Sequence, residues 1–465
     1  TNTVVPFGYI YAINKYLTKQ ITIEQINEAE MMINASGYNF DRSRWQYILD
    51  EHDGFLPIVI HAIPEGTIVP IGVPIVRIEN TDKKCAWLVS YIETMLLRSS
   101  WYGTTVATNA YEIKKLLDEY SLRHTNGIFN TAFSLHNFGA RGATSYEAEI
   151  LSSMAHAISF SGSDSLQANR YINAMYPQFD DNGKKVFTPF VFSVIASEHS
   201  VSCSQSDYET RNDYNIAVKM INLLEEEINK KIQNNSLYDL DENGNKTDII
   251  NQTIVSIVID TYNAYRFADE FIGKKLKNKI IELSKLGGKV VLRPDSGNPT
   301  EMPIEIIKIL MDNFGFSVNA NGYKRLPDFL AVLQGDGIKY DSIKEILKNM
   351  DNEKLSINNI VFGMGGQLVT PEKGRDAYSF AMKATAQKVS GNDEWQHLIK
   401  DPITDFGKKS LTGHVSTYSV NYSAPKALEI EEIEKRNDNS IQDMMLKVFE
   451  NGKFIFENKQ SFNEI

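Results

Sequence analysis

The sequence predicts an α/β protein in which parallel strands alternate with helices, together with a second, smaller α+β domain. Two observations lead to this prediction. From about residue 130 to residue 379, short β-branched runs alternate with helical stretches, which is the pattern of parallel strands joined by crossover helices. On both sides of this region, the chain is rich in short strands and polar turns. We therefore predict that residues 1–129 and 380–465 form the smaller domain and that residues 130–379 form the main one.

Composition limits the class of protein. The chain has 465 residues, of which 42% are hydrophobic and 23% charged, as in a globular protein with one large and one smaller domain. Its net charge of −11 argues against nucleic acid as a partner but is compatible with a local basic pocket for an anionic metabolite. Two cysteines, and no apolar stretch long enough to span a bilayer, predict a cytoplasmic protein without a membrane partner.

The N-terminal part is predicted to be helical first and strand-rich later. Residues 7–56 carry apolar side chains at helical spacing. After them, β-rich runs separated by glycine and proline turns predict a small antiparallel cluster, with strands at Ile58–Ile60, Ile68–Val69 and Ile75–Val76. Two helices should follow, one over Cys85–Trp101 and another over Ala110–Tyr120.

The middle of the chain supplies seven predicted strands and the helices between them. The strands are placed at Ala132–Leu135, Ala157–Phe160, Val191–Ile195, Ile254–Asp260, Lys289–Arg293, Phe329–Gln334 and Ile360–Gly363. The helices include Tyr214–Lys231, Asn263–Phe271, Ile304–Phe314 and Ser342–Met350. Such units could close as a barrel or lie as an open sheet, and their spacing does not decide between the two.

Two polar insertions interrupt this alternation. Asp180–Gly183 is a typical turn between strand-like flanks. Residues 234–248 form a longer polar stretch that, from Asp239 onward, resembles the start of a calcium-binding loop. The twelfth position of that loop would be Ile250 instead of the required glutamate, so we predict a solvated loop rather than a metal site.

The segment Val290–Pro299 is the most informative stretch. A β-branched run ends abruptly in Arg293, Asp295 and turn residues, as at the exit of a buried strand. Because Arg293 and Asp295 are two positions apart, they should point to the same side of an extended backbone. There they could hold a phosphate beside a sugar hydroxyl or a metal ion, or simply form a surface ion pair at a turn.

Comparable polar clusters follow the other predicted strands. In parallel α/β folds, ligands bind at the carboxyl ends of the strands, so we expect these clusters to line one pocket. Each cluster also has a plainer interpretation as a tight turn, a glycine hinge, a core aromatic or a structural histidine. The clusters are His136–Gly142, Ser161–Asp164, Ser197–Ser200, Asp260, Arg293–Asp295, Gly335–Gly337 and Gly363–Gly366.

Taken in order, these motifs resemble those of the nicotinamide phosphoribosyltransferases, which are type II phosphoribosyltransferases, over nearly the whole chain. The strings that carry the resemblance are Trp101-Tyr102 with Thr105–Asn109, Leu135-His136 with Phe138-Gly139 and Arg141-Gly142, Ala196 with Glu198–Ser200, Asp260 with Tyr262, Arg293–Pro299, Gln334–Gly337 and Lys400–Pro402. The resemblance implies an irregular α/β barrel of parallel strands and a homodimer with active sites at its interface.

The activity implied by the resemblance is a phosphoribosyl transfer. 5-Phosphoribosyl 1-diphosphate and nicotinamide would give nicotinamide mononucleotide and diphosphate, with Mg²⁺ as cofactor. ATP would be a co-substrate that is hydrolysed through a phosphorylated histidine, matched here by His199. Because catalysis must hold the charge of the leaving diphosphate, guanidinium groups suit the site.

The resemblance also implies roles for individual residues. Arg141, His199 and Arg293 would hold the diphosphate, while Asp295 and Asp336 would bind ribose hydroxyls. Gly335 and Gly366 would offer backbone groups to the mononucleotide, and Phe138 would stack on the pyridine ring. The 5′-phosphate would meet Arg375, Lys383 and Lys400. Asp260, Ser256 and Gly365 are expected to complete the substrate-binding set, and the catalytic residues would be His199, Asp295 and Arg293.

Asp164 matches the position that faces the amide of the base. A carboxylate accepts a hydrogen bond from an amide NH₂ group but repels a second carboxylate, so Asp164 favours nicotinamide over nicotinate. The alternatives are a nicotinate phosphoribosyltransferase, a non-catalytic relative that retains the pocket, and an unrelated barrel enzyme such as an aldolase. An aldolase would need a lysine at a strand end, and none is clearly placed.

One departure from the family pattern concerns the start of the chain. The family's Thr-Asp-x-Tyr-Lys stretch, whose tyrosine covers the nicotinamide ring in the partner's pocket, has no counterpart in this sequence. We expect that the natural protein continues upstream of Thr1.

Overall fold

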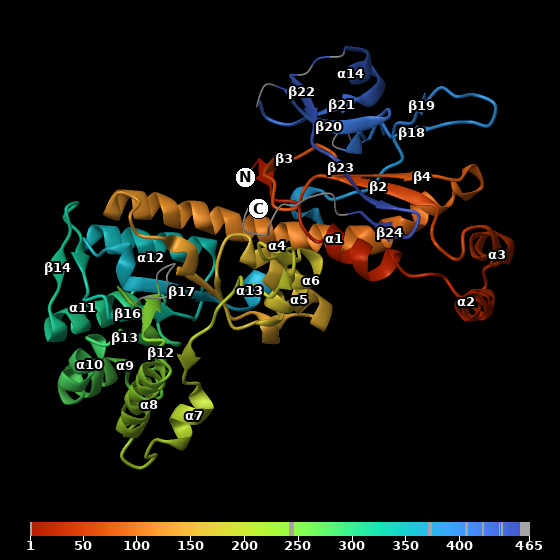
Figure 1. Ribbon diagram of the computed structural model, residues 1–465. Helices are drawn as coiled ribbons and strands as arrows, with labels where there is room; N and C mark the ends of the chain where they lie inside the picture. Colours follow the sequence, from red (N-terminus) through yellow and green to blue (C-terminus); the bar gives the residue numbers. More distant parts are fainter. Residues whose placement is uncertain are drawn as a thin grey trace.

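The computed structural model describes residues 2–240, 246–370, 374–404, 408–420, 423–436, 438 and 440–455. The chain forms two lobes that share one long helix, α4 (Leu88–Thr125) (Figure 1). The larger lobe contains a seven-stranded sheet, and the smaller lobe contains antiparallel sheets built from both ends of the chain. No helix within the described part of the chain combines the length and apolar character needed to cross a membrane.

The larger lobe is a barrel of seven parallel strands in the order β6-β5-β17-β16-β13-β12-β9. Its strands are β5 (Leu135–Asn137), β6 (Gly162–Ser163), β9 (Ile195–Ala196), β12 (Thr253–Val258), β13 (Gly288–Arg293), β16 (Leu330–Gln334) and β17 (Ile360–Met364). The sheet closes because Phe192, just before β9, forms a parallel bridge with Gly162 of β6. The structure therefore confirms the predicted irregular α/β barrel and excludes the alternative of an open sheet.

Alternation along the strands separates the barrel interior from the helical layer. Val290 and Leu292 of β13 belong to the large core under the helices. Val291, between them, packs with Ala331 and Leu333 of β16 in a separate inner cluster. Because side chains alternate between faces in a strand, positions 291, 293 and 295 share the inner side.

Helices cover the outside of the barrel, as predicted. The four regions expected to be helical are α8 (Tyr214–Gln233), α9 (Ala264–Arg266) continuing as a π-helix over Phe267–Lys275, α11 (Met302–Phe314) and α12 (Tyr340–Asn352). Between them and around the sheet lie α5 (Tyr146–Ala157), α6 (Gln167–Met175), α7 (His199–Ser204), α10 (Lys277–Ser284) and α13 (Gly366–Val369). All of these helices except α7 contribute apolar side chains to one continuous core.

Three predicted strands were misplaced. The strand expected at Ala132–Leu135 begins only at Leu135, because Asn130 caps a short 3₁₀ helix over Thr131–Phe133. The strand expected at Ala157–Phe160 is wrong, since α5 extends to Ala157 and β6 comes later. The strand expected at Val191–Ile195 reduces to β9 and the single bridge at Phe192.

Helix α4 also corrects a prediction, because the two expected helices are one element of 38 residues. The polar residues between them are satisfied within the helix: the hydroxyls of Thr105 and Thr108 donate to the carbonyl oxygens four residues earlier, each at 2.6 Å. Gly103 lets the chain at Phe7 approach, since a Cβ there would lie 2.6 Å from the Phe7 carbonyl oxygen. The serine- and threonine-rich stretch is therefore a packing surface and not a break.

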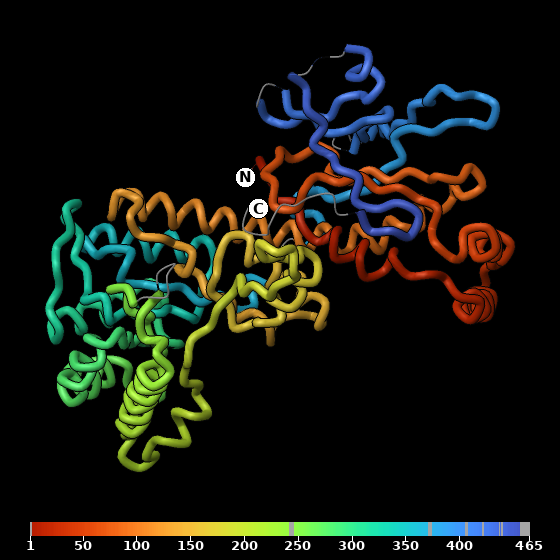
Figure 2. The backbone as a smooth tube through the Cα atoms, viewed as in Figure 1, coloured from red at the N-terminus to blue at the C-terminus, as the bar shows by residue number. Residues whose placement is uncertain are grey.

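The smaller lobe joins both ends of the chain. Strand β2 (Ile58–Ala62) pairs antiparallel with β4 (Val76–Asn80) on one side and with β23 (Leu446–Glu450) on the other. Figure 2 shows these N-terminal and C-terminal segments running side by side. The remaining strands are β1 (Thr3–Val4), β3 (Val69–Pro70), β18 (Ala386–Gln387), β19 (Gln396–His397), β20 (Val415–Val420), β21 (Lys426–Glu429), β22 (Ile441–Asp443) and β24 (Lys453–Phe454).

The helical start and the Asp180–Gly183 turn follow the predictions, whereas the insertion at 234–248, expected to be a loop, contains two paired strands. Residues 7–56 contain α1 (Tyr9–Ala12), a π-helix over Ile13–Leu17, α2 (Ile23–Ala35) and α3 (Arg42–Glu51). The Asp180–Gly183 turn joins β7 (Gln178–Phe179) to β8 (Lys185–Val186). The polar insertion forms a hairpin of β10 (Tyr238–Leu240) and β11 (Lys246–Ile250), and the tip between these strands lies outside the described residues.

Candidate active site

The carboxyl ends of the barrel strands carry the predicted polar residues. Alternation places Arg293 on the inner side of β13, and Asp295 follows two positions later. The Arg293 guanidinium contacts the Asp295 carboxylate through two nitrogens, at 2.9 Å from Nη2 and 3.4 Å from Nε. The two side chains are 13% and 19% exposed, so the pair lies at the rim, where a ligand can reach it.

Gly335 packs against this ion pair from the neighbouring strand β16. A Cβ at Gly335 would lie 2.9 Å from Asp295 Oδ1 and 3.5 Å from Arg293 Nε. A side chain there would push the carboxylate away from the guanidinium. Glycine at this position therefore keeps the rim open beside the ion pair. Asp336 follows with an exposed side chain, and its carbonyl oxygen accepts from Gln334 Nε2 at 3.0 Å.

His199 lies beside the same ion pair, at the start of α7. Its Nε2 is 3.2 Å from Asp260 Oδ1, and its Nδ1 is 3.8 Å from Asp295 Oδ2. The Ser296 hydroxyl donates to the other oxygen of Asp260, so this carboxylate is held from two sides. The imidazole is 40% exposed, whereas the Asp260 side chain is only 7% exposed. The imidazole therefore faces solvent on one side and contacts the buried Asp260 carboxylate on the other.

Phe138 occupies the inner side of β5 below Arg293. The Arg293 guanidinium carbon is 5.1 Å from the centre of the Phe138 ring, within the range of a cation–π contact. Gly363 of β17 makes room for this ring, because a Cβ there would lie only 2.1 Å from Phe138 Cε2. The Phe138 ring is therefore fixed between a glycine and a cation at the mouth of the barrel.

Asp164 faces His136 and Ser193, and the centre of the His136 ring lies 4.9 Å from that of Phe138. Its Oδ1 is 2.7 Å from His136 Nε2 and 2.7 Å from the Ser193 hydroxyl. Partial burial raises the pKa of Asp164, but hydrogen bonds from His136 and Ser193 and the charges of His136 and Arg293 outweigh it, and the pKa falls below its usual value. Asp164 is thus a carboxylate at neutral pH.

Arg141 lies on a 3₁₀ helix at Ala140–Gly142, with an exposed side chain. Hydrogen bonds from Ser200 lower the pKa of Glu198, and the charges of His199 and Arg141 lower it further. The Arg141 guanidinium is therefore within electrostatic range of the start of α7. That Arg141, His199 and Arg293 together hold the diphosphate stays a prediction.

The glycines after β17 provide open backbone. A Cβ at Gly142 would lie 3.2 Å from Gly366 Cα, so these two chain segments approach closely. No described atom lies within 4 Å of a Cβ built at Gly366, which leaves space for a ligand. Gly365 precedes it, with the Phe138 carbonyl oxygen 3.8 Å from a Cβ built there. Ser256 is buried in the middle of β12, below the rim.

Among the described residues, the cations predicted to bind the 5′-phosphate make no side-chain hydrogen bond or ion pair with the residues of the rim. Arg375 pairs with Asp376 at 3.0 Å and donates to the Phe380 carbonyl oxygen at 3.1 Å. Lys383 Nζ donates to the Met382 carbonyl oxygen, and Lys400 binds Ser410 through its backbone. All three side chains are exposed. Their role as phosphate ligands stays a prediction.

Three residues that contact the site had no assigned role in the sequence prediction: His136, Ser193 and Ser296. His136 lies two residues before Phe138 in the His136–Gly142 cluster. Because residues two apart in a strand share a face, this spacing could have indicated that His136 points into the barrel. Ser193 and Ser296 reach Asp164 and Asp260 across different strands. Sequence spacing carries no signal for such contacts.

Comparison with known proteins fits this geometry. Residues 133–453 match the model of the nicotinate phosphoribosyltransferase (NAPRTase) family, and residues 1–60 match that of the nicotinamide phosphoribosyltransferase N-terminal domain. A nicotinamide phosphoribosyltransferase of Xanthomonas campestris is 33% identical, over 97% of this chain and 87% of the relative. One from Acinetobacter baylyi is 32% identical, over 89% of this chain and 76% of the relative.

A solved structure supports the fold. Human nicotinic acid phosphoribosyltransferase superposes with a TM-score of 0.52 at 14% identity, covering 100% of this chain and 84% of that chain. The chain is therefore a pentosyltransferase, an enzyme that transfers a phosphoribosyl group. Within that class, it belongs to the nicotinate and nicotinamide phosphoribosyltransferase family of NAD salvage.

Proposed function

We propose that this enzyme transfers phosphoribosyl from 5-phosphoribosyl 1-diphosphate to nicotinamide, giving nicotinamide mononucleotide and diphosphate. One observation carries the choice of base: the ionised Asp164 lies on the same rim as Phe138 and the Arg293–Asp295 pair. The two curated relatives reported above bear the same activity in their names.

The charged groups of the rim suit the chemistry of this transfer. As diphosphate leaves, C1 of the ribose becomes oxocarbenium-like and negative charge collects on the leaving group. Arg293 and Arg141 remain charged at any working pH and would stabilise that group. Asp295, held by Arg293 at 2.9 Å, would accept hydrogen bonds from ribose hydroxyls, with Asp336 next along the rim. Phe138 would align the pyridine ring so that its nitrogen faces C1.

Mg²⁺ fits the donors on the rim. Asp260 and Asp295 offer oxygen ligands on either side of His199. Mg²⁺ commonly binds through one or two carboxylates plus substrate phosphates, and Asp260 and Asp295 are the two rim carboxylates next to His199. When bound, the ion would neutralise charge on the diphosphate. Asp260 and Asp295 are the side chains that we propose would hold it.

Nicotinamide is favoured over nicotinate by the charge on Asp164. Its Oδ2 takes part in no hydrogen bond recorded among the described residues, while Oδ1 already accepts from His136 and Ser193. An amide NH₂ group can donate to that free oxygen. A carboxylate in the same place would meet an unpaired like charge, which is a strong means of rejection.

The test of this proposal is a base-competition assay. Purified protein is incubated with 5-phosphoribosyl 1-diphosphate, Mg²⁺ and either nicotinamide or nicotinate, and the nucleotide product is identified. We expect nicotinamide mononucleotide, and Asp164→Asn should narrow the preference for nicotinamide by about tenfold or more. Asp328→Asn, which changes an exposed carboxylate that pairs with Arg325, is the matched control. A preference for nicotinate, or an unchanged preference in Asp164→Asn, would contradict the proposal.

We further propose that ATP hydrolysis is coupled to the transfer through phosphorylation of His199. The imidazole is 40% exposed, and its Nε2 rests on Asp260, so Nδ1 faces the side of Asp295 and Arg293. A phosphoryl group there would lie beside cations that can stabilise its charge. His199→Ala should abolish ATP hydrolysis and leave a slower, uncoupled transferase. His397→Ala, which removes an exposed imidazole of the smaller lobe, is the control, and ATP hydrolysis that persists in His199→Ala would refute the role.

A homodimer is the assembly that we propose. Phe133 and Phe192 stand 54% and 46% exposed, with ring centres 6.0 Å apart, beside Ser193 of the base pocket. Exposed aromatic pairs next to a site suit burial by a second subunit. Sedimentation of the wild type and of Phe133→Ser would test this, with a shift toward monomer expected for the variant.

A further inference from the structure

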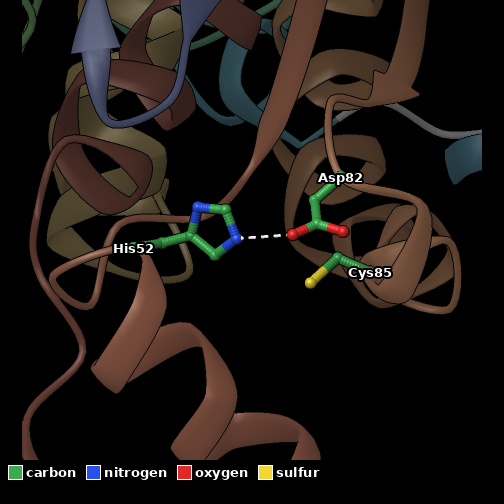
Figure 3. Close-up of side chains that lie close together, drawn as sticks. All are labelled: His52, Asp82 and Cys85. Atoms are coloured by element: carbon green, nitrogen blue, oxygen red, sulfur yellow. Dashed lines mark hydrogen bonds and ion pairs between the residues drawn. The ribbon is translucent and has the colours of Figure 1, made fainter.

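A second cluster of metal-binding side chains lies in the smaller lobe, away from the barrel rim. It consists of His52, which follows α3, and of Asp82 and Cys85 at the 3₁₀ helix that precedes α4. Figure 3 shows the imidazole, the carboxylate and the thiol pointing into one space. The potential ligand atoms of the three residues all lie within 4.8 Å of one another, and no other such group occurs among the described residues.

The donor types favour one class of ion. An imidazole nitrogen, a carboxylate oxygen and a thiolate sulfur form a mixed set that suits Zn²⁺, whereas Mg²⁺ and Ca²⁺ prefer oxygen ligands alone. The ligand atoms of a tetrahedral zinc site lie about 3.4–3.8 Å apart. His52 Nε2 and Asp82 Oδ2 are 2.8 Å apart and share a hydrogen bond, so they would part slightly while the sulfur moves closer.

The surroundings hold the carboxylate and both chain segments in place. The Tyr47 hydroxyl donates to Asp82 Oδ2 at 2.8 Å, and the Lys84 backbone N–H donates to Asp82 Oδ1 at 2.8 Å. Such outer contacts orient metal ligands in known sites. Trp45 on α3 packs edge-on against Trp87 with ring centres 4.9 Å apart, which fixes α3 against the start of α4.

Solvent reaches the cluster only from the side of His52 and Asp82. Cys85 is fully buried, whereas His52 and Asp82 are 26% and 21% exposed. An ion could therefore enter past the imidazole and the carboxylate and reach a thiol protected from solvent. Three protein ligands leave one tetrahedral position, on the solvent side, for water.

We propose that His52, Asp82 and Cys85 form a zinc-type site that joins the α2–α3 hairpin to the start of α4. Binding would break the hydrogen bond between His52 and Asp82, leave the neutral imidazole protonated at Nδ1, and release the thiol proton of Cys85 to solvent as the sulfur–metal bond forms. The site is separate from the transferase residues, so its test does not depend on the proposed reaction.

Cobalt substitution tests this site directly. Chelator-treated, reduced, tag-free protein is titrated with CoCl₂ and then with ZnCl₂. We expect one Co²⁺ per chain, a sulfur-to-cobalt charge-transfer band in the near ultraviolet, visible bands of a four-coordinate ion, and loss of all of them when Zn²⁺ is added. Zn²⁺ should also raise the melting temperature.

Matched variants identify the ligands. Cys203, which is exposed, is the only other cysteine in the chain, so Cys203→Ser should keep the band and Cys85→Ser should lose it. Should Cys85→Ser fail to fold, His52→Asn provides the second test, with a loss in Co²⁺ affinity of about tenfold or more. The proposal is overturned if wild-type protein gives no sulfur band, if the band follows Cys203 instead of Cys85, or if His52→Asn binds Co²⁺ as tightly as the wild type.

Discussion

Asp164 at the barrel rim and Glu65 at the joint between the two lobes are carboxylates that differ in exposure, and their pKa values move in opposite directions. Glu65 is 4% exposed and accepts from the backbone N–H groups of Gly8 at 2.7 Å and Ile10 at 3.0 Å, and from the Tyr176 hydroxyl. Burial outweighs these hydrogen bonds and raises the pKa of Glu65 to about 7. At Asp164, an imidazole and a guanidinium reverse the effect of burial.

The difference separates a carboxylate that stays charged from one that ties parts of the fold together. Asp164 is half exposed, accepts two hydrogen bonds and lies near the Arg293 guanidinium, so it stays ionised, as the proposed selection of bases requires. Glu65 has only neutral donors, contributed by α1 and by the end of α6, and its hydrogen bonds tie these elements together. The exposure of each carboxylate and the charge of its nearest partners both distinguish the two kinds of group.

The largest expected effect is at the rim, where Arg293 serves both the ion pair and the ring of Phe138. Arg293→Ala should lower kcat/KM for 5-phosphoribosyl 1-diphosphate by about 100-fold or more, because a fixed donor to the leaving group is lost. Steady-state kinetics would measure this, and Arg325→Ala, which opens an exposed ion pair, is the control. A loss below threefold would remove Arg293 from the catalytic set.

At the joint, Glu65→Gln should change stability and not activity. Because the folded pKa of Glu65 is about 7 and the usual value is 4.5, the folded state binds the extra proton, and wild-type stability should fall as pH rises from about 4.5 to about 7. Relative to Glu65→Gln, which cannot ionise, the wild type should lose up to about 3 kcal/mol over that window. Denaturant unfolding at pH 5 and pH 8 checks this. Parallel curves for the two proteins would show that Glu65 does not titrate there.

Gly363→Ala tests how firmly the Phe138 ring is fixed. The new methyl would lie 2.1 Å from Phe138 Cε2, so the ring must move or the strand must yield, at about 1–3 kcal/mol. We expect a lower melting temperature and weaker nicotinamide binding. Gly366→Ala is the informative comparison, because its methyl meets no described atom and should leave the melting temperature unchanged. Equal melting temperatures for the two variants would contradict this account of the ring.

The smallest effect should come from Ser193→Ala, which removes one of the two hydrogen bonds to Asp164 Oδ1. His136 remains at 2.7 Å, so Asp164 should stay ionised and the preference for nicotinamide should fall only about two- to fivefold. Competition kinetics with both bases would detect such a shift. A loss as large as that of Asp164→Asn would mean that Ser193, and not the carboxylate, selects the base.

The sequence predicted those parts of the fold that have strong periodic patterns. The strands near Ile254–Asp260 and Lys289–Arg293 are clear β-branched runs, and the pairing of Arg293 with Asp295 follows from their two-residue spacing. Strands β6 and β9 have two residues each, which is too short for any period to be visible. The boundaries of the two domains stay a prediction.

The site was predictable in composition but not in its contacts. Motifs indicated Asp260 and His199, yet their pairing depends on β9 lying beside β12, which no local pattern specifies. Of the expected phosphate cations, Arg375 and Lys383 precede β18 and Lys400 follows β19, and all three side chains are exposed, so no buried pattern in the sequence sets their directions.

Helix α4 has a mechanical consequence for how substrates enter. At about 1.5 Å per residue, its 38 residues span roughly 57 Å, and it packs against α1 and β4 of the smaller lobe and against α5 and α12 of the barrel. A single helix that packs along both lobes opposes hinge bending between the lobes. Admission of the sugar-phosphate and escape of the nucleotide must then rely on movement of local segments around the barrel mouth, with the two lobes turning as one rigid frame.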